Sequence, residues 1–282
     1  MKTDIFETIT NNMIEAMESA TGDFKMPWGA NPTIPTNLQS KKNYRGVNVL
    51  QLWISGAIQG FTSPYWMTFN QGKELGGMVR KGQKATPIVF WKMVKIKDDK
   101  TGEDKTLPMA RSYYVFNAEQ FDGIEIPEPQ KFENETIDEI EELISLNNID
   151  IQHGGESAAY NFAKDQILMP NLERFHSTEG YYETLLHEMT HWTGHASRCD
   201  RKLCGQFGSE DYAYEELVAE LGSAFLCANF GITNNLQHPE YLKSWIAVLK
   251  NDKSALRKAA QHAQLAFDYV VGTEFEAAEK VA

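Results

Sequence analysis

The chain has 282 residues, of which 42% are hydrophobic, 23% are charged and 11% are aromatic, a balance that excludes a disordered or fibrous protein. No apolar run approaches the roughly 18 residues that a membrane span needs, and the 3 cysteines are too few and too odd in number for a disulfide framework. The 27 basic and 39 acidic residues give a net charge of -12, which over the whole chain argues against nucleic acid as a partner.

Four apolar residues near the start of the sequence predict the first helix. They recur at steps of four, the spacing of one helical face: Ile5, Ile9, Met13 and Met17. Acidic residues interrupt this pattern, so the segment lacks the continuous apolar core of a secretory signal. We therefore expect a cytoplasmic protein with no membrane partner.

The next part of the chain mixes helical and strand patterns. Residues 46–60 predict a short helix bounded by glycines, and residues 64–70 predict a strand that leads to a helix capped by Asn70. Two runs rich in β-forming residues, 86–97 and 111–121, are separated by a polar turn. Together they predict a β-hairpin.

A segment at residues 123–136 combines two prolines with charge and has no apolar period, which is typical of a linker. We place the domain boundary there, between an N-terminal domain of residues 1–128 and a C-terminal domain of residues 129–282. Beyond it the patterns predict one helix, two short strand regions and then three or four helices, at about 137–148, 149–155, 158–170, 178–194, 211–230, 239–250 and 254–271. The expected fold class is α+β, with an α+β N-terminal domain and a mainly helical C-terminal domain that carries a small sheet.

The net charge hides a basic region. Residues 1–128 hold 15 basic and 14 acidic residues, whereas residues 129–282 hold 12 and 25. Within the first half, residues 41–97 hold 10 basic residues and one acid, Glu74. Cations that bind phosphates, interleaved with aromatic rings that stack on bases, are what single-stranded nucleic acid requires.

The candidate DNA-binding residues all lie in this basic region, residues 41–97. They are Lys41, Lys42, Arg45, Trp53, Lys73, Arg80, Lys81, Lys84, Trp91 and Lys92. Three cations around one glycine in the segment 80–84 have no packing explanation, so they are the strongest of the set. Each tryptophan has an alternative interpretation as a core residue, because both sit among apolar neighbours.

Residues 187–191 read His-Glu-Met-Thr-His, the His-Glu-x-x-His pattern of zinc hydrolases. Two histidines four residues apart lie on one face of a helix and can bind one metal ion. Glu188 between them is placed to take a proton from water on that metal. The alternative is a pair of surface histidines that are only hydrogen-bonded.

A catalytic zinc takes three protein ligands and leaves one position open. Ser197 stands where the extended metzincin pattern has a third histidine, and His195 follows the helix-ending Gly194, so neither is expected to bind metal. Glu216 and Glu220 share a face of the downstream acidic helix, where one carboxylate can bind metal and the other can orient an imidazole. Glu215 points about 100° away and is the weaker candidate.

These segments resemble a known family. Residues 187–201, HEMTHWTGHASRCDR, and 212–226, YAYEELVAELGSAFL, resemble the zincin-like metallopeptidase domain of the ArdC family of antirestriction proteins from plasmids and phages. Residues 41–53, 64–92 and 113–123 resemble the N-terminal domain of that family, to which single-stranded DNA binding is attributed.

The resemblance implies specific roles and partners. His187, His191 and Glu216 would bind Zn²⁺, Glu188 would be the catalytic base, and Glu220 would support a ligand. The partners would be single-stranded DNA and a protein or peptide substrate whose identity is unknown, and the function would be antirestriction.

Three further expectations concern mechanism and alternatives. Tyr212 or Tyr214 is expected to stabilise an oxyanion, and the strand around residues 166–170 is expected to pair with an extended peptide. One alternative is a zinc protease that acts on DNA-bound or crosslinked proteins. The other is a DNA-binding module with a non-catalytic zinc site.

Overall fold

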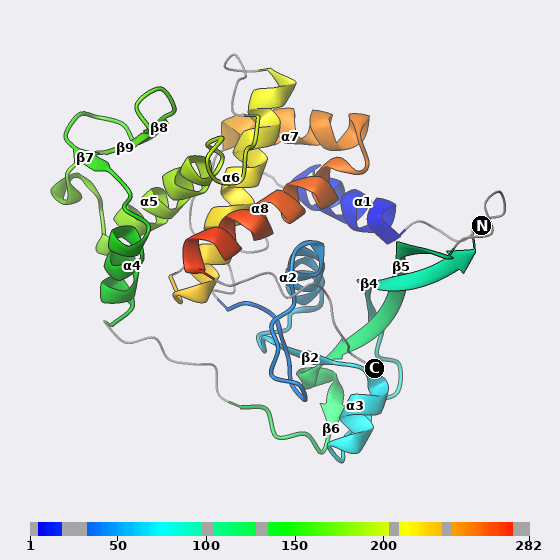
Figure 1. Ribbon diagram of the computed structural model, residues 1–282. Helices are drawn as coiled ribbons and strands as arrows, with labels where there is room; N and C mark the ends of the chain where they lie inside the picture. Colours follow the sequence, from blue (N-terminus) through cyan, green and yellow to red (C-terminus); the bar gives the residue numbers. More distant parts are fainter. Residues whose placement is uncertain are drawn as a thin grey trace.

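The computed structural model describes residues 5–18, 33–97, 104–127, 135–202, 209–232 and 239–272. Its α-helices are α1 (Ile5–Glu18), α2 (Val47–Gln59), α3 (Phe69–Glu74), α4 (Glu135–Leu146), α5 (Thr178–Thr193), α6 (Glu210–Asn229), α7 (Pro239–Asn251) and α8 (Ala255–Val271). Its strands are β1 (Thr36–Asn37), β2 (Tyr65–Met67), β3 (Met78–Val79), β4 (Thr86–Lys97), β5 (Asp104–Asn117), β6 (Phe121–Asp122), β7 (Ile151–His153), β8 (Ala159–Asn161) and β9 (Gln166–Met169). The described residues also include two 3-10 helices, η1 (Ala118–Gln120) and η2 (Leu172–Arg174). The α+β fold class is confirmed (Figure 1).

The N-terminal part is built on a four-stranded sheet in the order β1-β2-β5-β4. Strands β4 and β5 form the predicted antiparallel hairpin, which extends from the body of the molecule (Figure 1). β5 begins at Asp104, earlier than the sequence suggested. Asn48 on α2 covers part of the open edge of β4, because its amide donates to the Val89 carbonyl at 2.7 Å and accepts from the Val89 N–H at 2.8 Å.

The start of α3 corrects one prediction. Thr68, and not Asn70, is the N-cap, since the Thr68 hydroxyl accepts from the Gln71 N–H and the Gln71 side chain accepts from the Thr68 N–H. This reciprocal pair is a capping box, which satisfies two backbone donors at once. Asn70 lies inside the first turn of the helix.

The C-terminal part places a three-stranded sheet beside α5, in the order β7-β9-β8. β9 pairs with β7 in parallel and with β8 in antiparallel orientation. Both edges of β9 are therefore occupied, and the expectation that residues 166–170 pair with a peptide is wrong.

Four long helices, α5 to α8, form the body of this half and lie close to the predicted positions. α6 packs against both α5 and α8, and α6 crosses behind α8 in Figure 1. Gly222 of α6 lies directly against Thr190 of α5, where a Cβ would meet Thr190 Cγ2 at 2.4 Å. The two helices that carry the motif residues are thus held unusually close.

The two halves share one hydrophobic core. Ile9, Trp53 and Ile88 from the first half lie in the same buried cluster as Phe225 and Phe267 from the second. α1 packs on α7, and α2 packs on α8. The proposed boundary, between residues 128 and 129, lies outside the described residues. Among the helices described, none combines the length and the apolar character that crossing a bilayer requires.

Candidate metal centre and basic surface

The motif helix α5 is fixed at its start and along one side. The Ser177 hydroxyl accepts from the Gly180 N–H at 3.0 Å and caps the helix. Leu185, Leu186 and Met189 are fully buried, so that side of α5 is anchored in the core. The opposite side faces α6, and there His187 is only 6% exposed.

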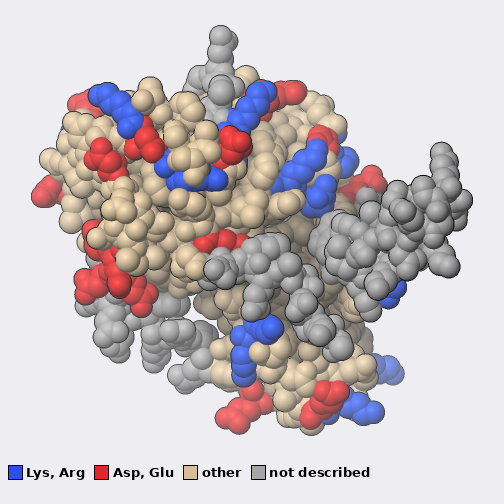
Figure 2. All heavy atoms as spheres, viewed as in Figure 1, with Lys and Arg blue, Asp and Glu red and all other residues tan. Residues whose placement is uncertain are grey.

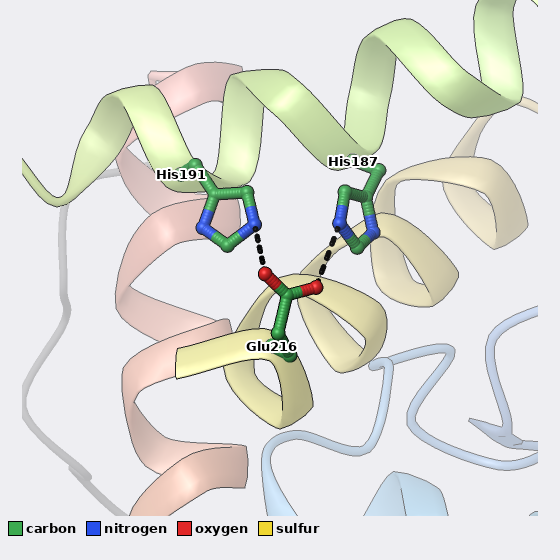
Figure 3. Close-up of side chains that lie close together, drawn as sticks. All are labelled: His187, His191 and Glu216. Atoms are coloured by element: carbon green, nitrogen blue, oxygen red, sulfur yellow. Dashed lines mark ion pairs between the residues drawn. The ribbon is translucent and has the colours of Figure 1, made fainter. Parts of the chain in front are cut away.

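His187, His191 and Glu216 come together between α5 and α6 (Figure 3). One potential ligand atom from each lies within 4.8 Å of the others. His187 Nε2 is 3.7 Å from Glu216 Oε2, and His191 Nε2 is 3.6 Å from Glu216 Oε1. Two imidazoles and one carboxylate are a donor set that suits a divalent transition-metal ion.

The other ring nitrogens face carboxylates as well. His191 Nδ1 donates to Glu215 Oε1 at 3.2 Å, and His187 Nδ1 lies 3.8 Å from Glu220 Oε2. Each carboxylate favours a proton on Nδ1 and leaves Nε2 directed at the shared position. Glu220 thus lies where an orienting residue was expected, whereas the sequence ranked Glu215 too low.

The electrostatics of the cluster favour a cation. Burial alone lowers the pKa of His187, but the hydrogen bond to Glu216 and the charges of Glu188, Glu220 and Glu216 outweigh it and raise the pKa to about 9. Burial acts to raise the pKa of Glu216, but His187 and His191 lower it to about 2. Several carboxylates share this buried space, so a divalent ion would neutralise charge that is otherwise costly to bury.

Glu188 follows the first histidine of the motif and is 8% exposed. The two candidate tyrosines differ. Tyr212 hydrogen-bonds Glu216 and so reaches the centre, whereas the Tyr214 hydroxyl lies 3.3 Å from His262 Nδ1 and turns toward α8.

His195 lies apart from this cluster. Its Nδ1 is 2.8 Å from the Ser197 hydroxyl, and its ring contacts Phe162 at a centroid distance of 5.5 Å. The group of metal-binding side chains found among the described residues does not include it.

The sequence reasoning named Glu215 only as the weaker candidate, and it missed Arg201, the partner of Glu215. Arg201 Nη2 donates to Glu215 Oε1 at 2.8 Å, and Arg201 Nε donates to Glu215 Oε2 at 3.1 Å. The only signal in the sequence was a basic residue shortly after the motif, which is too common to interpret.

Seven of the candidate DNA-binding cations are exposed and lie on the N-terminal part: Lys41, Lys42, Arg45, Lys73, Arg80, Lys81 and Lys84. The two arginines are engaged within the protein. Arg45 forms an ion pair with the nearly buried Asp268 of α8. Arg80 donates to the Phe121 carbonyl at 3.4 Å and lies 3.6 Å from Asp122.

Trp53 is a core residue, its alternative interpretation, and its prediction as a DNA-binding residue is wrong. Its ring is 3% exposed and packs against Phe225 at a centroid distance of 5.9 Å, and its Nε1–H donates to the Thr33 carbonyl at 3.1 Å. A ring held this way inside the core cannot stack on a base. The side chains of Trp91 and Lys92 lie outside the described residues.

Figure 2 shows how charge is distributed over one face of the molecule. In its lower part, which holds α3 and β6, separate blue groups stand beside red ones and do not merge into one basic face. The +9 charge of residues 41–97 in the sequence is thus moderated locally by acids from other segments, such as Asp122 beside Arg80.

Two family models match the chain. Residues 3–116 match the N-terminal domain of anti-restriction factor ArdC, and residues 138–262 match a zincin-like metallopeptidase. In sequence, the uncharacterized protein y4eC of Sinorhizobium fredii is 39% identical over 98% of this chain and 94% of its own length. DNA primase TraC of Escherichia coli is 35% identical over 97% of this chain, which spans only 20% of the primase.

Solved structures agree with these matches. The metal-free crystal structure of antirestriction ArdC protein from the R388 plasmid has a TM-score of 0.80 and 38% identity, covering 95% of this chain and 96% of that chain. The Mn(II)-bound structure of the same protein has a TM-score of 0.78 and 37% identity, covering 97% and 100%. The chain therefore belongs to the ArdC family of antirestriction proteins, with an ArdC N-terminal domain followed by a zincin-like domain.

Proposed function

We propose that this protein is an antirestriction protein that binds single-stranded DNA and carries a zinc-dependent peptidase site. The observation that carries the peptidase part is the convergence of His187, His191 and Glu216 within 4.8 Å, with Glu188 beside them. The Mn(II)-bound structure of the R388 relative supports a divalent metal in this family. Zinc is our choice because two imidazoles and one carboxylate, with one position left open, are typical of catalytic zinc.

The residues of the centre would have two separate roles. His187, His191 and Glu216 would hold the ion, and Glu215 and Glu220 would fix the two imidazoles from behind. A divalent ion bound there supplies Lewis acidity, lowering the pKa of water and polarising a carbonyl.

Glu188 would act as the general base. Its carboxylate accepts a proton from the attacking water and passes it to the leaving amine, and its low exposure keeps bulk water from competing. The Tyr212 hydroxyl, which reaches Glu216, is the better placed of the two tyrosines to donate to the oxyanion. The peptide substrate would not pair with β9, because both edges of that strand are already paired.

A Glu188→Gln variant tests the peptidase. Because Glu188 is not a metal ligand, the variant should fold and bind metal as the wild type does, yet lose about 10²- to 10⁴-fold in peptide hydrolysis. Glu179→Gln, an exposed acid on the same helix, is the matched control and should keep full activity. Hydrolysis that survives in Glu188→Gln would refute this mechanism.

The DNA-binding part of the proposal depends on the exposed lysines of the N-terminal part, which would bind phosphates. Because Trp53 is buried, stacking must come from other rings. The large aromatic side chains exposed in the described portion of this half are Phe69, Phe90, Tyr113 and Tyr114. We also propose that residues 1–128 and 129–282 are the functional domains.

A second candidate function is that of a zinc protease that acts on proteins bound or crosslinked to DNA. It is favoured by the matches to DNA primase TraC, in which a region like this chain forms one fifth of a DNA-processing enzyme. Plasmid transfer into a restricting host distinguishes the two functions. If Glu188→Gln protects incoming DNA as well as wild type does, antirestriction does not require hydrolysis.

A further inference from the structure

Arg201 connects the two helices that carry the candidate metal ligands. It lies in the loop after α5, and its backbone N–H donates to the Gly194 carbonyl at 2.9 Å, which turns the loop back under the helix. The Arg201 side chain is only 3% exposed and forms an ion pair with Glu215, whose side chain is 9% exposed. Glu215 in turn accepts from His191 Nδ1.

The same guanidinium also contacts the end of α5. Nη1 donates to the Thr193 hydroxyl at 2.8 Å, and Nη2 donates to the Thr190 carbonyl at 2.6 Å. Thr190 is among the last four residues of α5, whose carbonyls accept no backbone N–H from within the helix. The Thr190 carbonyl also accepts from the Thr193 hydroxyl, at 2.6 Å. A cation is also favoured at a helix C-terminus. Arg201 therefore stabilises the end of α5 and holds Glu215 of α6 with one planar group.

We infer that Arg201 is a positioning residue for the metal centre, acting on His191 through Glu215. This role depends on the proposed metal binding. Two parallel N–H donors fix both oxygens of Glu215, so the carboxylate is presented to His191 in one orientation and Nε2 of His191 remains directed at the ion. Partners that orient a ligand histidine in this way typically change metal affinity about 10- to 100-fold when they are altered.

The test is an Arg201→Lys variant of the full chain, titrated with Mn²⁺ by calorimetry after metal is removed. Lysine keeps the charge but cannot hold both carboxylate oxygens, so we expect Mn²⁺ affinity to fall about 10- to 100-fold. Arg198→Lys is the matched control. Arg198 lies in the same loop, is similarly buried, pairs with Asp165 and stacks on Trp192, but within the described residues it does not contact the metal centre.

The melting temperature without metal separates positioning from folding. Both arginine variants should lose stability, but only Arg201→Lys should also lose Mn²⁺ affinity. Equal losses of affinity in the two variants, or an affinity within twofold of wild type in Arg201→Lys, would overturn the inference. A wild-type protein that binds no Mn²⁺ would instead refute the metal assignment itself, and the positioning role with it.

A double-mutant cycle tests whether the effect passes through Glu215. In a Glu215→Gln background, which keeps the side-chain size, changing Arg201 to lysine should cause no further loss of Mn²⁺ affinity. If Arg201→Lys folds poorly, Glu215→Gln alone serves as the second variant, and it too should bind Mn²⁺ about 10- to 100-fold more weakly. Losses that add in the double variant would show that Arg201 acts by another route and would overturn the inference.

Discussion

The contact between Gly222 and Thr190 sets the spacing of the two metal-bearing helices, and Gly222→Ala perturbs it directly. A methyl group at Gly222 would meet Thr190 Cγ2 at 2.4 Å and Oγ1 at 2.8 Å. Thr190 is fully buried, and its hydroxyl donates to the Leu186 carbonyl at 2.9 Å, so the side chain cannot turn away without losing that bond. To relieve this clash, either the helices separate or Thr190 loses that bond, and each change destabilises the protein.

Two opposing effects decide the magnitude. Overpacking of a core costs about 1–3 kcal/mol, and the buried, hydrogen-bonded Thr190 places this site toward the upper end. Alanine is a better helix former than glycine by about 1 kcal/mol. We therefore expect a net loss of about 2 kcal/mol, or roughly 4–8 °C in melting temperature for a chain of this size.

Thermal unfolding of metal-free protein measures this loss, and Gly180→Ala is the control. Gly180 is also helical, but its added Cβ would meet only Ser177 Oγ, at 3.4 Å, an ordinary contact. That variant should be as stable as wild type or more stable, whereas Gly222→Ala should be less stable and should bind Mn²⁺ more weakly. A Gly222→Ala protein as stable as wild type would refute the packing argument.

Three further results are expected. Because the pKa of His187 is raised to about 9, the metal-free site holds a proton that a metal must displace, and Mn²⁺ affinity should rise from pH 6.5 to 9 and then level off. The same proton stabilises the metal-free protein. That contribution to the free energy of unfolding is complete below pH 6.5 and is lost as the pH rises through about 9. Calorimetry across pH measures both. Changing Lys81 and Lys84 to Ala should flatten the salt dependence of single-stranded DNA binding by about two contacts, at about 0.7 each, with the circular dichroism unchanged. Trp53→Ala should lower the free energy of unfolding by an amount typical of core truncation, about 3–5 kcal/mol, and an effect on DNA binding alone would contradict its burial.

The features that sequence predicted well are local. The helices α5 to α8 and the β4–β5 hairpin follow from apolar periods and turn residues within short stretches. The cap at Thr68 was missed because Thr68 and Asn70 are both good capping residues two positions apart, and only the reciprocal bond with Gln71 distinguishes them.

The features that sequence could not supply depend on contacts between distant segments. Trp53 is buried by Phe225, a residue from the other half of the chain, so its neighbours in sequence did not determine its exposure. Arg201 reaches Glu215 only because the loop after α5 folds back on Gly194. His187, His191 and Glu216 were accessible to sequence reasoning because helical spacing and a family resemblance together restricted the choice.

The most direct measurement of the central claim is anomalous diffraction at the zinc and manganese edges from crystals of the protein as purified. We predict one metal ion per chain, bonded to Nε2 of His187, Nε2 of His191 and the carboxylate of Glu216 at about 2.0–2.2 Å, with a zinc signal. A peak bonded to other residues, or no peak between α5 and α6 in protein that still cleaves peptides, would contradict the account.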